Sequence, residues 1–338
     1  MRKGNKLKRY FYGVLLILVV VFGYQLNAWS KSGLTYTYID LAGNQFPDLI
    51  TDTIIGYPVQ YVVKQRDTLL DIARDFGLGI NELENLYPEM DPWLPPPGKK
   101  MVLPVMWILP PVERTGIVIN IAELRLYYFI DGKEYAENFR ISLKKEHDEH
   151  GFPDTRFVQT YPVGIGDEKF KTPPGLYRVI EKRDNPYWYI PPSLHEKYAP
   201  LKVVPPGPDN PLGDYWIGIG NSYGIHGTNI PWSIGRLATH GCLRLYPEDI
   251  EVLFPSVRVG TPVRIIYEPV KIGFRQGKIY AEIHRDIYKK IDDFHQYGLL
   301  KLRDSGLMDA VDLERFKAEL KQKSGIPVEV GKILVSRN

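Results

Sequence analysis

The sequence predicts a mainly β protein. Its largest unit is expected to be a β-sandwich or compact barrel-like domain, with a small βααβ unit before it and a small α+β extension after it. The 338 residues include 28 prolines and 30 glycines, which favour turns and short strands over a helical bundle. Residues 116–267 are rich in β-branched and aromatic residues. They lack the regular alternation of strands and helices that builds a doubly wound sheet.

Composition and charge exclude several classes of protein. With 44% hydrophobic and 25% charged residues, the chain is too apolar to be disordered. Its single cysteine excludes a disulfide framework and a thiolate metal cluster. The formal charge of +3 becomes −2 without the first nine residues, which hold five cations and no acid. The remainder lacks the basic excess that nucleic-acid binding requires, so we expect no nucleic-acid partner.

The N-terminus has the pattern of an export signal. The basic residues are followed by an apolar segment, residues 11–26, which approaches the lower length limit of a membrane span. We expect residues 1–28 to be a signal peptide or an uncleaved anchor, with a buried core helix as the alternative. Either signal places the rest of the chain in the periplasm or cell envelope, and an uncleaved anchor would contact the inner membrane.

The βααβ unit is expected over residues 57–105. A short strand opens it, and Thr68 and Asp71 then have the spacing of a capping box before apolar residues at helical intervals. A glycine pair separates this helix from a second one over residues 80–86. A proline-rich turn leads to the closing strand at residues 101–103.

The residues of this unit resemble the LysM module. The matching pieces are Tyr61-Val62-Val63, Asp67-Thr68-Leu69, Ile72-Ala73, Phe76-Gly77 and Pro97-Gly98 before Val102-Leu103-Pro104. LysM modules bind glycans that contain N-acetylglucosamine, so the resemblance implies an anchor on peptidoglycan. One departure is Tyr87, where the family usually has Asn. A degenerate module that only packs against its neighbour is the alternative.

The main β domain is expected over residues 115–268. An Asp131-Gly132 pair has the composition of a hairpin turn. The expected strands cover residues 117–120, 124–129, 175–180, 215–219 and 262–267.

The α+β extension is expected over residues 269–338. Its charged part, residues 285–293, predicts a solvated helix, and a strand is expected over residues 328–335. A further helix between them has an apolar stripe made by Leu313, Phe316 and Leu320. Nothing in the extension has a catalytic pattern, so we expect it to pack against the other domains.

One cysteine and two histidines carry the clearest chemical signal. A thiol attacks a carbonyl as the thiolate, and an imidazole of His226 or His240 could take the proton of Cys242 and return it to a leaving amine. If Cys242 ends a strand, His240 two residues earlier lies on the same face. Gly241 would let a carbonyl group approach the backbone, so amides near Cys242 could form an oxyanion hole.

The chemistry of these residues leaves alternatives open. A single cysteine is often a small buried hydrophobe, and the histidines could satisfy hydrogen bonds of the core. Cys242, His226 and His240 could also bind zinc with a water as the fourth ligand, although no nearby carboxylate is evident as the partner of that water. We expect neither a metal nor a cofactor.

The motifs around these residues resemble the signature of the YkuD-type L,D-transpeptidases. The signature residues are His226-Gly227-Thr228 and Thr239-His240-Gly241-Cys242-Leu243-Arg244. Further matching segments are residues 116–120, 125–128, 162–166, 172–175 and 206–213. The resemblance covers roughly residues 115–268. With the export signal and the LysM-like unit in front, the whole chain is similar to the ErfK/YbiS branch of the family.

The resemblance implies a cysteine enzyme that acts on peptidoglycan tetrapeptide stems. Such an enzyme cleaves the bond between the third and fourth residues, releases D-Ala and forms a thioester on Cys242. The acceptor would be an amine, either of a neighbouring stem, which gives a 3–3 cross-link, or of a lysine in an outer-membrane lipoprotein. Water as the acceptor would give an L,D-carboxypeptidase or an amidase. A non-catalytic wall-binding protein is the remaining alternative.

The resemblance also implies roles for individual residues. Cys242 is the nucleophile, and His226 is the base, oriented by the carbonyl of Gly227. His240 and the amides of Gly241 and Cys242 lie near the oxyanion.

Arg244 and Thr239 are the candidate substrate-binding residues. The position of Arg244 is Asn in many relatives and often Arg in the branch that this chain resembles. A guanidinium fork matches the two oxygens of a carboxylate, and a structural ion pair is the alternative. Thr239 replaces the commoner Ser and keeps the hydroxyl.

Overall fold

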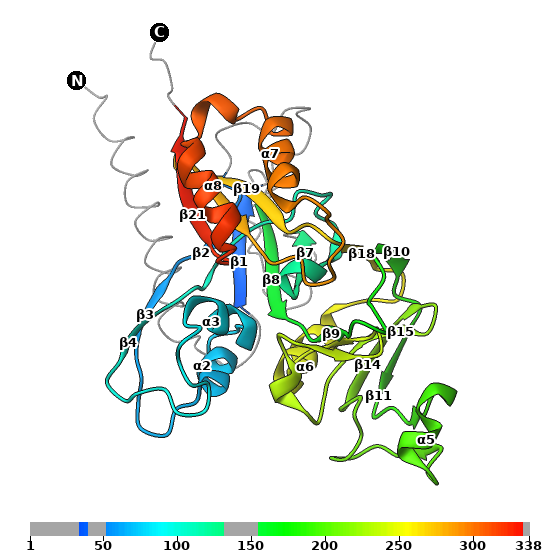
Figure 1. Ribbon diagram of the computed structural model, residues 1–338. Helices are drawn as coiled ribbons and strands as arrows, with labels where there is room; N and C mark the ends of the chain where they lie inside the picture. Colours follow the sequence, from blue (N-terminus) through cyan, green and yellow to red (C-terminus); the bar gives the residue numbers. More distant parts are fainter. Residues whose placement is uncertain (1–33, 40–51, 132–154, 334–338) are drawn as a thin grey trace, which may run out of the picture.

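The computed structural model describes residues 34–39, 52–131 and 155–333 (Figure 1). The expected export signal, residues 1–28, lies outside these ranges, as does Gly132 of the expected hairpin turn. Within the described ranges, none of the helices has the length and apolar character needed to span a membrane.

A six-stranded sheet forms the centre of the molecule. Its strands, in spatial order, are β1 (Leu34–Ile39), β8 (Thr155–Pro162), β7 (Arg125–Asp131), β6 (Gly116–Asn120), β18 (Pro262–Ile266) and β10 (Gly175–Arg178). Strands β6 and β18 pair in parallel, and the other neighbours are antiparallel. The strands expected over residues 117–120, 124–129 and 262–267 are confirmed within one or two residues at each end, and the one expected over residues 175–180 ends at Arg178. The strand expected over residues 215–219 is confirmed in a second sheet.

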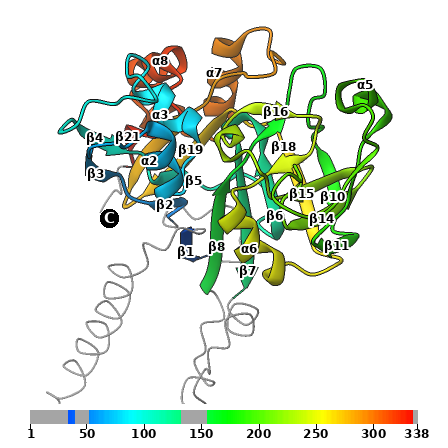
Figure 2. The same ribbon diagram turned by 90° about the horizontal axis from the view of Figure 1, so that it is seen from below.

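A four-stranded sheet packs against one face of the central sheet (Figure 2). It contains β11 (Glu181–Asp184), β14 (Tyr215–Gly220), β15 (Tyr223–His226) and β17 (Leu243–Arg244), and α6 (Pro247–Ser256) lies beside it. The core between the sheets joins Ile117 and Leu126 of one sheet to Ile217 and Ile225 of the other. This arrangement confirms the expected sandwich-like, mainly β architecture.

The βααβ unit covers the opposite face of the central sheet. Its elements, β3 (Val59–Val62), α2 (Leu69–Asp75), α3 (Ile80–Leu86) and β4 (Lys100–Leu103), have the expected order. The hydroxyl of Thr68 accepts the Asp71 N–H, as the capping pattern predicts. Val118 and Tyr127 of the sheet share a core with Leu69 and Leu83 of the unit. Strand β6 is fully buried because both of its faces are covered.

The C-terminal extension is a three-stranded sheet covered by two helices. Its elements are β19 (Val270–Arg275), β20 (Lys278–Ile283), β21 (Pro327–Lys332), α7 (Phe294–Asp304) and α8 (Leu313–Gln322). Phe316 and Leu320 of the expected apolar stripe are buried, whereas Leu313 is exposed.

The helix expected over residues 285–293 is wrong, because this segment is irregular. The carboxylate of Asp286 accepts the backbone N–H groups of Lys290 and Ile291, and Lys289 has a φ of 51°. An Asp side chain that caps the following backbone in this way competes with helix formation. The hairpin of β19 and β20 was not expected from the sequence.

The remaining elements are short. They are β2 (Ile54–Gly56) paired with β5 (Met106–Ile108), β9 (Ile165–Gly166) with β16 (Leu237–Thr239), β12 (Trp188–Tyr189) with β13 (Val203–Val204), α5 (His195–Tyr198), and the 3-10 turns Ile121–Glu123, Pro192–Leu194, Pro231–Ser233 and Met308–Ala310. The segment of β12, α5 and β13 forms an excursion between β11 and β14 (Figure 1).

Candidate active site

The neighbouring strands β15 and β17 bring the candidate residues together. They pair in parallel, with Ile225 opposite Leu243 and His226 opposite Arg244, and Cys242 directly precedes β17. Paired residues point to the same side of a sheet, and so do residues two apart on one strand. His226 and Arg244 therefore share one face of the sheet, and the Arg244 charge acts on both His226 and Cys242, which are sixteen residues apart in the chain.

The imidazole of His226 is buried and fixed in orientation. Its Nδ1 lies 2.6 Å from the carbonyl oxygen of Gly227, so Nδ1 carries the hydrogen and donates it, and Nε2 is the basic nitrogen. The ring stacks on Trp216, with the centroids 5.7 Å apart. Burial and the charge of Arg244 lower the pKa of His226 to about 3, against the opposing effect of nearby carbonyls. His226 is therefore neutral near pH 7.

The thiol of Cys242 is half-buried and also neutral. Burial raises its pKa, while the Gly224 backbone amide and the Arg244 charge act in the opposite direction. Its Sγ donates to the carbonyl of Ser222 at 3.9 Å. Asn221 and Ser222 have φ values of 51° and 61°, as both central residues of a type I′ hairpin turn require, and this turn presents the Ser222 carbonyl.

A tight turn leads into Cys242. The hydroxyl of Thr239 donates to the Cys242 carbonyl at 2.6 Å and accepts the Gly241 N–H at 3.1 Å. Gly241 has a φ of 103°, and a Cβ there would lie 2.6 Å from the ring of Tyr223, so glycine is required. Thr172, which lies in a segment that the family resemblance covers, donates its hydroxyl to the Gly241 carbonyl at 3.0 Å.

This turn changes the expectation for His240. Strand β16 ends at Thr239, and β17 begins only after Cys242, so His240 and Cys242 are not on one continuous strand. The condition for their sharing a strand face, that Cys242 ends a strand, is therefore not met, because the chain turns at Gly241. The ring of His240 is exposed and packs on Phe170, with the centroids 4.5 Å apart.

The turn also changes the expectation for Thr239. Its side chain is buried, and its hydroxyl both donates and accepts within the turn. That hydroxyl therefore holds the backbone around Cys242 and is not presented to a substrate. The supporting residues Ser222 and Thr172 had no individual role in the sequence analysis, because their carbonyl and hydroxyl contacts depend on tertiary structure.

The guanidinium of Arg244 lies near both Cys242 and Tyr198 of α5. Burial lowers the pKa of Arg244, whereas Tyr198 and Cys242 raise it. Both of these residues therefore lie near the guanidinium. Its buried Nε has no hydrogen-bond partner. Across the described ranges, no carboxylate lies within ion-pairing distance of Arg244, so the structural ion pair is not present there.

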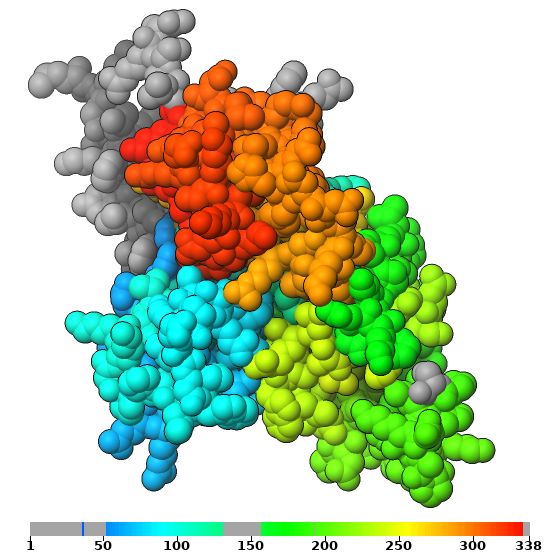
Figure 3. All heavy atoms as spheres, in the orientation of Figure 1, coloured from blue at the N-terminus to red at the C-terminus, as the bar shows by residue number. Residues whose placement is uncertain are grey.

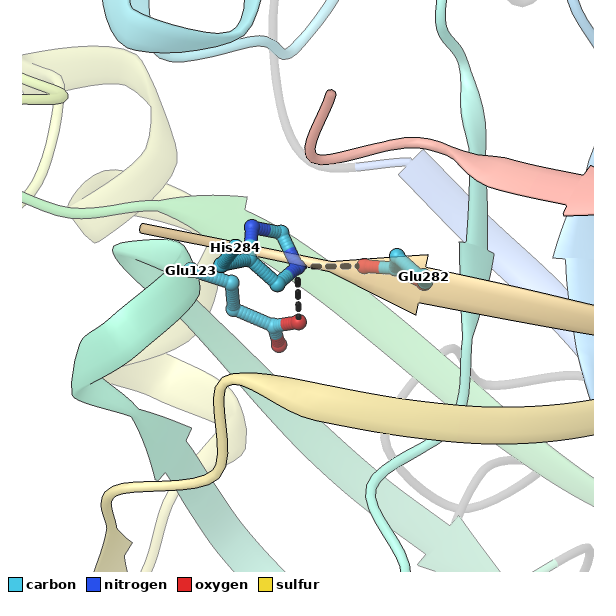
Figure 4. Close-up of side chains that lie close together, drawn as sticks. All are labelled: Glu123, Glu282 and His284. Carbon is cyan, nitrogen blue, oxygen red and sulfur yellow. Dashed lines mark hydrogen bonds and ion pairs between the residues drawn. The ribbon is translucent and has the colours of Figure 1, made fainter. Parts of the chain in front are cut away.

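The geometry does not favour a metal at this site. Within the part of the chain that the structure describes, one set of three metal-ligand side chains has its atoms within 4.8 Å of one another, namely Glu123, Glu282 and His284 (Figure 4). Cys242, His226 and His240 do not form such a set. At the buried cluster, the ammonium of Lys271 pairs with both carboxylates, at 2.8 Å from Glu282, so a protein cation already occupies the place of a metal.

Comparisons with known proteins agree on one family. Residues 114–265 match the family model of the L,D-transpeptidase catalytic domain. ErfK/SrfK of Salmonella typhimurium is 34% identical over 292 residues, which cover 82% of this chain and 87% of that protein. YcfS of Escherichia coli is 34% identical over 300 residues, which cover 84% and 87%. Both relatives are named as probable L,D-transpeptidases.

Among solved structures, the catalytic domain of the Enterococcus faecium L,D-transpeptidase is 22% identical, with a TM-score of 0.31. The match covers 46% of this chain and all of that one. This similarity adds nothing to the argument from sequence.

Proposed function

This chain belongs to the L,D-transpeptidase family, and from that premise we propose that it is an exported cysteine enzyme that acts on peptidoglycan tetrapeptide stems. Cys242 attacks the carbonyl carbon of the third stem residue and displaces D-Ala, and the resulting thioester passes its acyl group to an amine. The observation that carries this proposal is a neutral His226, with Nε2 as its base, on the strand beside the one that Cys242 directly precedes, with the Arg244 charge acting on both residues.

One histidine can carry the proton through both half-reactions. His226 Nε2 takes the thiol proton as Sγ attacks, and it returns that proton to the amine of D-Ala as the C–N bond breaks. The acceptor amine then attacks the thioester carbonyl and gives its proton to His226. As the C–S bond breaks, His226 returns the proton to Sγ. The enzyme ends each cycle in its starting protonation state.

We assign the oxyanion to the amide of Cys242. The Gly241 N–H already donates to the Thr239 hydroxyl, so it is directed into the turn and not toward a substrate. A backbone amide that the turn holds in place stabilises developing negative charge without reorganisation. His240 borders the same turn on its exposed side, and we retain it as a residue near the oxyanion.

We assign the carboxylate of the D-Ala leaving group to Arg244. Its guanidinium lies near Cys242 and has a buried Nε without a partner. A carboxylate would supply the acceptor that this nitrogen lacks. Thr239 acts as a positioning residue for the turn, in place of the substrate-binding role expected from the sequence.

The rest of the chain fits an enzyme of the cell envelope. We propose that residues 1–28 direct export or anchor the chain at the inner membrane. Residues 57–105 form the LysM-like unit that contacts glycan strands, residues 115–268 form the catalytic domain, and residues 269–338 form the extension. The acceptor is an amine of a neighbouring stem or of a lipoprotein lysine.

The test is a product analysis. The full chain is incubated with a disaccharide tetrapeptide, with and without a lysine-bearing acceptor peptide, and the products are analysed by mass spectrometry. Release of D-Ala together with a dimer or an acceptor adduct supports transfer. Release of D-Ala without either product would overturn transfer in favour of hydrolysis. Unchanged D-Ala release by the Cys242→Ala variant would overturn the cysteine mechanism.

A further inference from the structure

The βααβ unit touches the catalytic domain at the segment that carries the nucleophile. We call residues 235–248 the nucleophile segment, because they run from the residues before β16, through Cys242, into the first turn of α6. In Figure 3 the cyan surface of the unit meets the yellow-green surface of this part of the chain. The contacts lie on both sides of Cys242 along the sequence.

On the upstream side, two backbones are in direct contact. A Cβ built on Gly79 would lie 3.0 Å from the Cα of Gly235, and a Cβ on Gly235 would lie 2.7 Å from the Ile80 nitrogen. Next to this contact, Arg236 pairs with Glu84 at 2.8 Å. Backbone atoms this close cannot slide past one another without moving one of the two segments.

On the downstream side, an ion pair joins two helix ends. Arg74 in the last turn of α2 makes two hydrogen bonds, of 2.6 and 2.7 Å, with the carboxylate of Glu248 in the first turn of α6. A cation at a helix C-terminus and an anion at a helix N-terminus are both favoured by the helix dipoles. The buried Tyr246 also donates its hydroxyl to the Leu78 carbonyl at 3.3 Å.

The base of the unit is fixed to the central sheet. The buried guanidinium of Arg125 pairs with Glu82 at 2.6 Å and lies over the ring of Trp107, 4.0 Å from its centroid. Trp107 in turn donates its Nε1–H to Glu82 at 2.8 Å. With the shared apolar core, these contacts make the unit and the sheet one packed body.

We infer that the βααβ unit is a positioning element for Cys242, acting through the Gly79–Gly235 contact and the Arg74–Glu248 pair. A βααβ unit that served only to bind glycan would not need these contacts with the nucleophile segment, a backbone contact before Cys242 and a bidentate ion pair after it. The unit holds both ends of the nucleophile segment, and it thereby sets the approach of the thiol to the substrate carbonyl. The inference rests on the proposed role of Cys242 as the nucleophile.

Two variants of the full chain test this inference. Gly79→Ala adds one methyl group 3.0 Å from the Cα of Gly235 and 2.4 Å from the side-chain Oδ1 of Asn81, and its φ of −81° is one that alanine adopts. Arg74→Ala removes the ion pair, and Arg74→Lys keeps its charge. We expect Gly79→Ala and Arg74→Ala to lower kcat about tenfold while KM changes less than about twofold, because small misplacements of reacting groups are costly. Arg74→Lys should recover part of the loss.

The matched control is Lys278→Ala. Lys278 pairs with Glu329 at 2.7 Å, and both side chains are partly exposed, as in the Arg74–Glu248 pair, but this pair lies in the C-terminal sheet. Its loss should leave kcat unchanged. The rate of Cys242 alkylation by iodoacetamide, measured across pH and well below each unfolding temperature, reports thiol placement without any peptidoglycan substrate. It should change in the two test variants and not in the control.

The outcomes separate this inference from the proposed function. If Cys242→Ala is inactive but Gly79→Ala and Arg74→Ala keep kcat and alkylation rates within about twofold of the parent chain, the positioning role is wrong and the unit is only packed there. A drop in unfolding temperature with unchanged kcat leads to the same conclusion. Full activity of Cys242→Ala would instead remove the proposed function itself.

Discussion

His226 and Arg244 lie directly opposite one another on the parallel strands β15 and β17, and the guanidinium charge acts on the imidazole. Together with burial, it disfavours the imidazolium form of His226 in the resting enzyme. The thiol of Cys242 is likewise kept neutral by burial. The free enzyme therefore holds both groups in their neutral forms, and in the proposed mechanism the proton moves only when the substrate carbonyl is in place.

This protonation state can be read from the reactivity of the thiol. We expect the rate of iodoacetamide alkylation of Cys242 to rise continuously between about pH 6 and pH 9, because burial raises the pKa of the thiol above its usual value. The measurement follows carboxamidomethylation by mass spectrometry. A resting thiolate–imidazolium pair would instead give a rate that is constant across this range.

The lowered pKa of His226 also affects stability. The unfolded chain binds a proton at this residue below its ordinary pKa of 6.5, whereas the folded chain does so only near pH 3. The contribution of the neutral His226 imidazole to the free energy of unfolding is therefore complete above pH 6.5, and it is lost as the pH falls toward 3. We expect His226→Asn to flatten the decline in unfolding free energy across this window, measured by urea titration at several pH values. An unchanged slope would mean that the imidazole is not held neutral.

The buried cluster of Lys271, Glu123, Glu282 and His284 should be important for stability. Burial opposes the charge of Glu123, but Lys271 and His284 outweigh it and lower its pKa to about 2. Lys271→Met would leave two buried carboxylates with His284 as the one remaining cationic partner in the cluster, at a cost of about 3–5 kcal/mol in unfolding free energy. The control Lys278→Met removes a partly exposed pair and should cost about 0–1 kcal/mol. Equal losses in urea unfolding would contradict the structural role of the cluster.

Arg244 should determine how tightly the donor stem binds. Loss of a charged hydrogen bond costs about 1.5–3 kcal/mol, so we expect Arg244→Ala to lower kcat/KM about 10- to 100-fold. The same variant should lose little toward a stem whose C-terminal carboxylate is replaced by an amide. The measurement compares both substrates in both enzymes, and equal losses on the two would show that Arg244 does not bind this carboxylate.

Long-range strand pairing brings His226 beside Arg244, which lies two residues after Cys242. The motifs identified both residues, but their separation in sequence does not say that β15 and β17 are parallel neighbours. The turn through Gly241 was also not predicted, because the Thr172 hydroxyl that supports it lies far from Gly241 in sequence. That turn is the reason why His240 is not on one strand with the nucleophile.

The features of the fold that were predicted depend on neighbouring residues, and those that were missed depend on residues distant in sequence. The capping pattern at Thr68 and the β-branched segment of strand β6, residues 117–119, were predictable from neighbouring residues. The core that the βααβ unit shares with the central sheet and the cluster around Lys271 were not, because their members are distant in sequence. The segment of residues 285–293 was misjudged from its charge, since Asp286 bonds to the backbone and prevents a helix.

The most direct test of the account is the mass of the acyl-enzyme. The full chain is mixed with a tetrapeptide stem without an acceptor, quenched in acid and digested. We predict that the peptide containing Cys242 carries the stem without its terminal D-Ala as a hydroxylamine-sensitive thioester, and that the adduct is missing in Cys242→Ala and slow to form in His226→Asn. Release of D-Ala at the parent rate by Cys242→Ala, or an adduct on another residue, would contradict the account.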